Sequence, residues 1–90
     1  MRYHHIGCFG DSKERALPKF LGSFIGSGDA IERCYLKARR EGYDMFSVQN
    51  GGECWSGYKA EETYDKYGRS YDCYHGKGGI FASDVYTMSM

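Results

Sequence analysis

The residues best suited to chemistry in this 90-residue chain are its four cysteines, Cys8, Cys34, Cys54 and Cys73. Cysteines can bind a metal, attack a substrate as thiolates or cross-link the chain. Successive cysteines lie far apart here, and there is no Cys-x-x-Cys pair of the kind found in zinc ribbons and thioredoxin-like sites. A chain this short also has a thin core that benefits from cross-links. The spacing therefore predicts two disulfides, and neither a metal site nor a catalytic thiol.

The other reactive side chains are scattered along the sequence. His4 and His5 are neighbours, and consecutive strand residues point to opposite faces, so one strand cannot direct both imidazoles at one metal ion. Glu61, Glu62 and Asp65 lie on a short polar stretch and are expected to face water. The sequence contains no Gly-x-Ser-x-Gly motif and no recognisable acid–base pair. We therefore expect a protein that is not an enzyme and needs no cofactor.

Aromatic side chains are concentrated in the C-terminal half, among charged residues. The stretch contains Trp55, Tyr58, Tyr64, Tyr67, Tyr71 and Tyr74. Flat aromatic rings with polar edges suit both sugar rings and protein interfaces. Core packing is the favoured role for Trp55 and Tyr64, and a surface position is favoured for the other four. For a ligand, the predicted contacts are Tyr58, Tyr64, Tyr67 and Arg69.

Charge and hydropathy narrow the classes of partner. The chain has 12 basic and 12 acidic residues and no basic stripe, so nucleic acid is not an expected partner. No apolar run approaches the ~20 residues of a membrane span. The opening residues do not form a signal peptide, so we expect the mature form of the chain, or one to which Met1 has been added.

The clearest element is a helix over residues 29–41. Asp29 and Glu32 fit a capping box at its start, and Gly42 is placed to end it in the left-handed conformation. An apolar stripe at helical spacing is formed by Ile31, Cys34, Tyr35 and Ala38.

Short strands surround this helix. Strands are predicted over residues 3–9, 43–49, 53–58 and 83–88, with a tight turn at 50–52. Residues 60–67 predict a short helix ended by Gly68, and residues 21–28 predict a packed loop with a short extended piece. The pattern favours an α+β fold, with one main helix on a small antiparallel sheet. Cys34 on the helix would then reach a strand cysteine, of which Cys54 is the nearest candidate.

Several motifs, in a preserved order, resemble those of a WSC domain. They are Gly7-Cys8-Phe9 with Asp11-Ser12, Arg15-Ala16-Leu17-Pro18, Cys34, Gly42-Tyr43, Phe46, Gly51-Gly52-Glu53-Cys54-Trp55, Gly78-Gly79 and Asp84-Val85-Tyr86. Residues 63–70 with Cys73 and residues 76–79 resemble a cysteine-poor, WSC-like module of invertebrate extracellular proteins. The resemblance spans residues 5–86, so we treat residues 1–90 as one WSC-like domain.

The departures from the family concern cysteines. Typical WSC domains have eight, whereas Ala38, Ser56 and Lys77 stand here at positions where the family has cysteines. Loss of whole bridges explains this pattern, which implies that the remaining four still pair. Cys34–Cys54 with Cys8–Cys73 is the predicted pairing. The alternatives are Cys8–Cys34 with Cys54–Cys73, and Cys8–Cys54 with Cys34–Cys73.

The resemblance implies a PAN/apple-like, twisted-sheet architecture and a secreted, extracellular protein. The leading hypothesis is a non-catalytic recognition module that binds a glycan or an extracellular protein. The alternative is a self-assembling structural subunit of an extracellular matrix, fibre or secretion, and hence a homo-oligomer. It rests on the balanced charge and many tyrosines, which suit close subunit packing.

Overall fold

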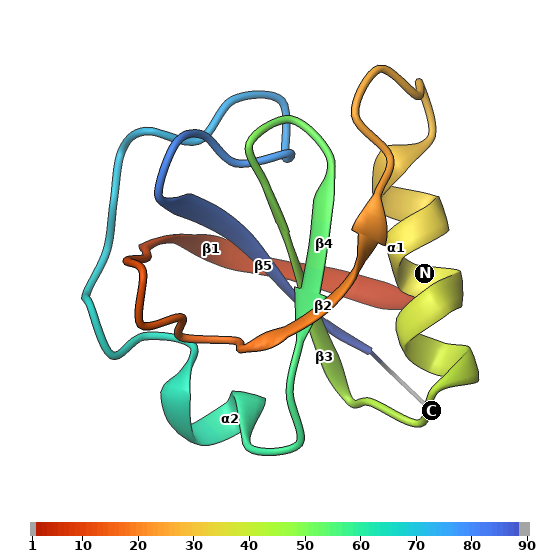
Figure 1. Ribbon diagram of the computed structural model, residues 1–90, viewed down its shortest axis with the longest axis horizontal. Coiled ribbons are helices and arrows are strands. Elements are labelled where there is room, and N and C mark those ends of the chain that lie inside the picture. Colours follow the sequence, from red (N-terminus) through yellow and green to blue (C-terminus); the bar gives the residue numbers. More distant parts are fainter. Residues whose placement is uncertain (1, 89–90) are drawn as a thin grey trace.

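The computed structural model describes residues 2–88 and has an α+β fold (Figure 1). In chain order the elements are β1 (Tyr3–Gly10), β2 (Lys19–Ser23), α1 (Ala30–Arg40), β3 (Met45–Gln49), β4 (Glu53–Ser56), α2 (Ala60–Thr63) and β5 (Ala82–Met88). The strands form one antiparallel sheet in the order β1-β5-β3-β4-β2. The predicted helix on an antiparallel sheet is therefore confirmed.

Helix α1 ends as predicted but begins differently. At its C-terminus Gly42 has φ 84°, its N–H donates to the Arg39 carbonyl, and the N–H of Tyr43 donates to the Ala38 carbonyl. These two bonds form a Schellman motif. At the N-terminus the predicted capping box is wrong, because Asp29 makes no side-chain capping bond. Its carboxylate instead accepts from Ser27 and from Nε of Arg33, and these bonds lower the pKa of Asp29.

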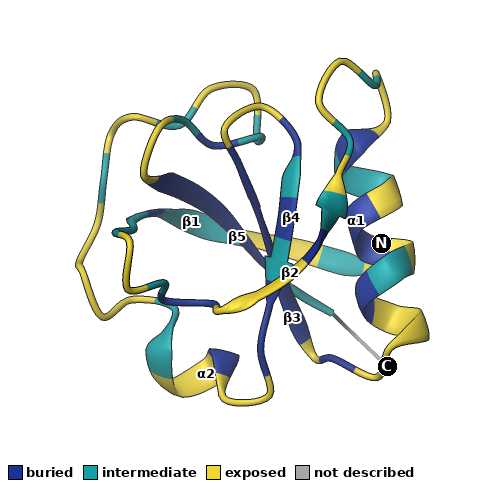
Figure 2. Ribbon diagram, in the orientation of Figure 1, coloured by how far each residue is buried: buried dark blue, intermediate teal, exposed yellow. Residues whose placement is uncertain are grey.

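Both faces of the sheet are covered. On one face, α1 packs its stripe against β3, and Cys34, Ala38, Phe46 and Val48 are fully buried there. On the other face, Leu17 and Ala60 bring the 11–18 segment and α2 onto Phe9, Met45 and Val85. Figure 2 shows the result, with β3 and most of β5 buried between the two layers.

The two predicted disulfides are both present. Cys34–Cys54 joins α1 to β4 inside the first core, with both cysteines fully buried. Cys8–Cys73 ties β1 to the loop that precedes β5. The alternative pairings are thereby excluded.

The main helix and most predicted strands differ by one or two residues at an end, and two further segments differ more. The extended piece expected within residues 21–28 is the edge strand β2, which starts earlier, at Lys19. Its pairing with β4 holds this short apolar segment extended. The predicted helix over residues 60–67 is regular only over Ala60–Thr63; turns follow as far as Gly68, whose φ is 77°.

Candidate functional site

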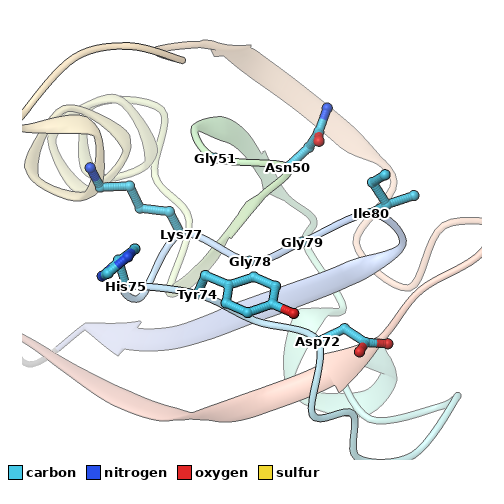
Figure 3. Close-up of a pocket in the computed structure, with 9 residues that line it drawn as sticks. All are labelled: Asn50, Gly51, Asp72, Tyr74, His75, Lys77, Gly78, Gly79 and Ile80. Atoms are coloured by element: carbon cyan, nitrogen blue, oxygen red, sulfur yellow. The ribbon is translucent and has the colours of Figure 1, made fainter.

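A groove lies where the β3–β4 turn meets the loop of residues 70–80. Both segments are at the top of Figure 1. The volume of the groove is about 590 Å³, within the range of small-molecule sites. It is called the glycine groove here and is lined by Asn50, Gly51, Asp72, Tyr74, His75, Lys77, Gly78, Gly79 and Ile80 (Figure 3).

Backbone hydrogen bonds hold the turn and the loop together. The N–H of Asn50 donates to the Gly79 carbonyl at 3.2 Å, and the N–H of Gly51 donates to the Lys77 carbonyl at 2.8 Å. A third bond, from the N–H of Tyr74 to the Gly78 carbonyl at 3.1 Å, folds the loop back on itself. The groove is thus formed by segments far apart in the sequence, joined through main-chain atoms.

The floor of the groove requires glycine. A Cβ on Gly79 would overlap the carbonyl oxygen of Asp72. A Cβ on Gly78, whose φ is 72°, would lie 2.5 Å from the carbonyl oxygens of Ala82 and Val48. A side chain at Gly78 would therefore push the loop away from the sheet, and one at Gly79 would distort the loop itself.

A buried carboxylate supports this floor from below. Asp84 is 3% exposed, and one of its oxygens accepts from the N–H of Gly78 at 2.8 Å. The other lies 2.6 Å from Nε2 of His5 on β1, so His5 has a strand-to-strand contact that its sequence position did not reveal. Beside it, the Tyr86 hydroxyl donates to the Gly76 carbonyl at 2.6 Å. Burial, helped by Asp84 and Tyr3, raises the pKa of Tyr86 and keeps it a donor.

The side chains above the floor combine a ring with polar groups. Tyr74 is 65% exposed, and Figure 3 shows its ring beside the Gly78–Gly79 backbone. His75 and Lys77 project near one end of this backbone, and Asp72 lies toward the other. Within residues 2–88, Lys77 and Asp72 take part in no ion pair. A flat apolar ring is thus surrounded by donors and acceptors that remain accessible to a ligand.

Local backbone strain is concentrated near the groove. Asn50 (φ 51°), His75 (φ 58°) and Phe81 (φ 50°) are non-glycine residues in the left-handed region. Such conformations cost free energy and persist where the surroundings impose them, and they often mark binding sites. The sequence signal for this site was the Gly76-Lys77-Gly78-Gly79 run next to Cys73. In the sequence this run contributed to the family resemblance, and Asn50, His75 and Lys77 were not among the predicted contacts.

The four contacts predicted from sequence lie outside the glycine groove and in two places. Tyr64 packs edge-on against Phe9, and Arg69 lies over the same ring. Tyr67 lies beside Gly10, the residue after Phe9, and its hydroxyl donates to the Glu14 carbonyl at 2.5 Å. Tyr58 is 79% exposed, and its ring contacts in a tilted arrangement that of Tyr43, which follows α1. The structure thus groups Tyr64, Tyr67 and Arg69 near Phe9 and leaves Tyr58 apart from them.

Residues 2–88 were also searched for a metal-ion site and for a membrane-spanning helix. No group of three or more histidine, cysteine, aspartate or glutamate side chains is arranged to hold a metal ion in this part of the chain. None of its helices is long and apolar enough to cross a membrane.

Comparison with known proteins gives one result. A family model, described as the WSC domain, matches residues 5–78. The match includes all four cysteines and the groove as far as Gly78. No curated protein matches the chain.

Proposed function

The chain belongs to the WSC domain family, and on that basis we propose that it is a non-catalytic extracellular module that recognises carbohydrate. WSC domains are generally non-catalytic. Two disulfides suit an oxidising, extracellular environment, and they stabilise a domain whose core is small.

The observation that carries the proposal is the position of Tyr74 in the glycine groove. A sugar offers an apolar C–H face and a rim of hydroxyl groups, and an accessible tyrosine ring beside polar groups matches both. Asp72 and Asn50 can accept hydrogen bonds from hydroxyls, and Lys77 can donate to them. At Gly51, which also lines the groove, a Cβ would meet nothing within 4 Å, so the absence of a side chain there leaves the backbone open to a ligand.

Tyr58, Tyr64, Tyr67 and Arg69 are retained as alternative contacts. Tyr58 is the most exposed of them, and its ring already contacts the Tyr43 ring. Tyr64 and Arg69 already pack on Phe9, and the Tyr67 hydroxyl is already bonded to the chain. These internal contacts favour the glycine groove over the four alternatives as the main site.

A glycan array with the whole chain tests the proposal. Tyr74→Ala is expected to weaken binding by about tenfold or more, because it removes the stacking ring and leaves the backbone bonds in place. Tyr71→Ala is the matched control, since Tyr71 is 94% exposed and does not line the groove. Tyr58→Ala and Tyr67→Ala report on the alternative contacts. Absence of binding to every glycan would refute the proposal.

Self-assembly as a structural subunit remains a second candidate, because of the sheet edge at β2. This strand pairs with β4 on one side only, and Phe20 on it is 49% exposed. Exposed edge strands can pair with another chain. Sedimentation over a dilution series tests this candidate: a concentration-dependent oligomer that Phe20→Lys returns to a monomer supports it. A monomer at high concentration contradicts it.

A further inference from the structure

A second, smaller pocket adjoins the glycine groove. Asn50 and Ile80 line both hollows, so the two share a border. The other residues of this second hollow, called the arginine pocket here, are Arg15, Gln49, Glu53 and Phe81. From this continuity we infer that the binding site has two subsites, and that its ligand is a linear oligosaccharide that crosses Asn50 and Ile80. This inference rests on the carbohydrate-binding function proposed above.

Arg15 is held rigidly in the arginine pocket. Its Nη1 donates to Oδ2 of Asp11 at 3.0 Å, and its guanidinium carbon lies 4.5 Å from the centre of the Trp55 ring. The Phe81 ring is 5.3 Å away on the same guanidinium. A side chain that is already ordered loses little rotamer entropy when a ligand arrives, which favours binding.

The polar groups behind Arg15 form a buried network. Asp11 also accepts from the N–H of Ala16 at 2.9 Å. Oriented to satisfy its neighbours, the Gln49 amide donates to Asp11 at 2.8 Å and to Ser83 at 2.9 Å, and accepts from Arg15 at 2.9 Å. Gln49 is 3% exposed. This network fixes Arg15 from the protein side while its side chain remains 25% exposed toward the pocket.

The arginine pocket has the chemistry of a neutral sugar subsite. Asp11 balances the charge of Arg15, so the pocket has no strong preference for an anion. The carboxylate of Glu53 accepts from Asn50 at 3.3 Å and from the Trp55 indole at 3.4 Å, and has further capacity to accept from hydroxyls. Phe81 is 41% exposed and offers an apolar ring at the border. The arginine pocket therefore combines a hydrogen-bond donor, an acceptor and an aromatic ring, as the glycine groove does.

The dependence of affinity on chain length tests the inference. Calorimetry would compare glucose, xylose, mannose and N-acetylglucosamine with their oligomers up to hexasaccharides. For the series that binds, affinity is expected to rise about tenfold or more from the shortest bound sugar to the longer oligomers. Phe81→Asn, which keeps a residue that tolerates positive φ, should bind the short sugars like the unmodified chain and lose this rise.

Arg15→Lys provides a second variant, because it keeps the charge beside Asp11 and removes the forked donor. Arg15→Lys should also reduce the increase of affinity with oligosaccharide length, whereas Tyr71→Ala should leave that increase unchanged. Equal affinity for single sugars and hexasaccharides would overturn the second subsite and leave carbohydrate binding intact. The second subsite would also be overturned if folded Phe81→Asn and Arg15→Lys both showed the same increase of affinity with sugar chain length as the unmodified protein. If no sugar in any series binds, the proposed function fails and the inference fails with it.

Discussion

The carboxylate of Asp84 accepts a hydrogen bond from the backbone N–H of Gly78 at 2.8 Å, and a buried strand residue thereby fixes the floor of the glycine groove. The same carboxylate contacts His5 on the neighbouring strand. The shape of the groove and the stability of the sheet therefore depend on one side chain.

Asp84→Ala should lower the free energy of unfolding by about 2–3 kcal/mol, because the N–H of Gly78 would be left buried without an acceptor. Asp84→Asn retains an amide oxygen that can accept from Gly78, and its loss should be about 1 kcal/mol. Denaturant unfolding measures both. Equal stability of Asp84→Ala and the unmodified chain would show that the bond does not support the fold.

Gly79→Ala should destabilise the fold by more than about 2 kcal/mol, since its Cβ would overlap the Asp72 carbonyl and force the 70–80 loop out of its conformation. Gly28→Ala is the control, because nothing lies within 4 Å of a Cβ there and its φ is not in the left-handed region. That substitution should be neutral or slightly stabilising. Thermal unfolding followed by circular dichroism compares the two, and similar melting temperatures would contradict the crowded floor.

Removing the two disulfides separately should have different local effects. In the chain-entropy model, the 65-residue and 20-residue separations correspond to about 4 and about 3 kcal/mol. Cys8→Ala with Cys73→Ala should also speed hydrogen exchange in residues 70–80, because Cys73 anchors that loop. Cys34→Ala with Cys54→Ala should mainly affect α1 and β4. Exchange mass spectrometry separates them, and identical exchange patterns would refute the anchoring role of Cys8–Cys73.

The stability of the protein should fall at alkaline pH because of Tyr86. Its pKa in the folded state is raised above the ordinary value of 10.0, mainly by burial. The folded state therefore holds this proton more tightly than the unfolded state does. The resulting stability is complete below pH 10 and is lost as the pH rises above it.

Tyr86→Phe should make the loss of unfolding free energy above pH 10 shallower. At neutral pH it should cost about 1 kcal/mol, because the bond to the Gly76 carbonyl is lost. Tyr71→Phe, at a position in water, should change neither quantity. Urea titrations at several pH values measure both, and an unchanged alkaline slope in Tyr86→Phe would contradict the assignment.

Sequence patterns predicted those elements that are determined by interactions between residues close together in the chain. The stripe of α1 and its end at Gly42 follow from helical spacing and from the freedom of glycine to adopt positive φ. Cys34 and Cys54 were paired because a helix on a sheet brings them together. The start of α1 could not be predicted in this way, because Ser27 and Arg33 compete for the carboxylate of Asp29.

The glycine groove could not be predicted because its parts meet only in the folded sheet. Asn50 reaches Gly79 because β3 pairs with β5, with Gln49 opposite Ser83. The sequence shows glycines in both segments but not the register that joins them. The tyrosines were easier to notice in the sequence. The contacts of Tyr64 with Phe9 and of Tyr67 with Glu14, however, join residues that lie far apart in the chain.

The pairing of Tyr3 with Met88 in the β1–β5 ladder has a consequence for how this unit can be displayed (Figure 1). The chain enters and leaves the sheet at adjacent points, an arrangement that allows a domain to be inserted into a surface loop of a host protein without pulling the host apart. From Met88 the seven residues of β5 lead about 20 Å to the opposite end of the strand, where the groove begins. A host, or a string of such units, would therefore hold each copy by one end and present the glycine groove at the other.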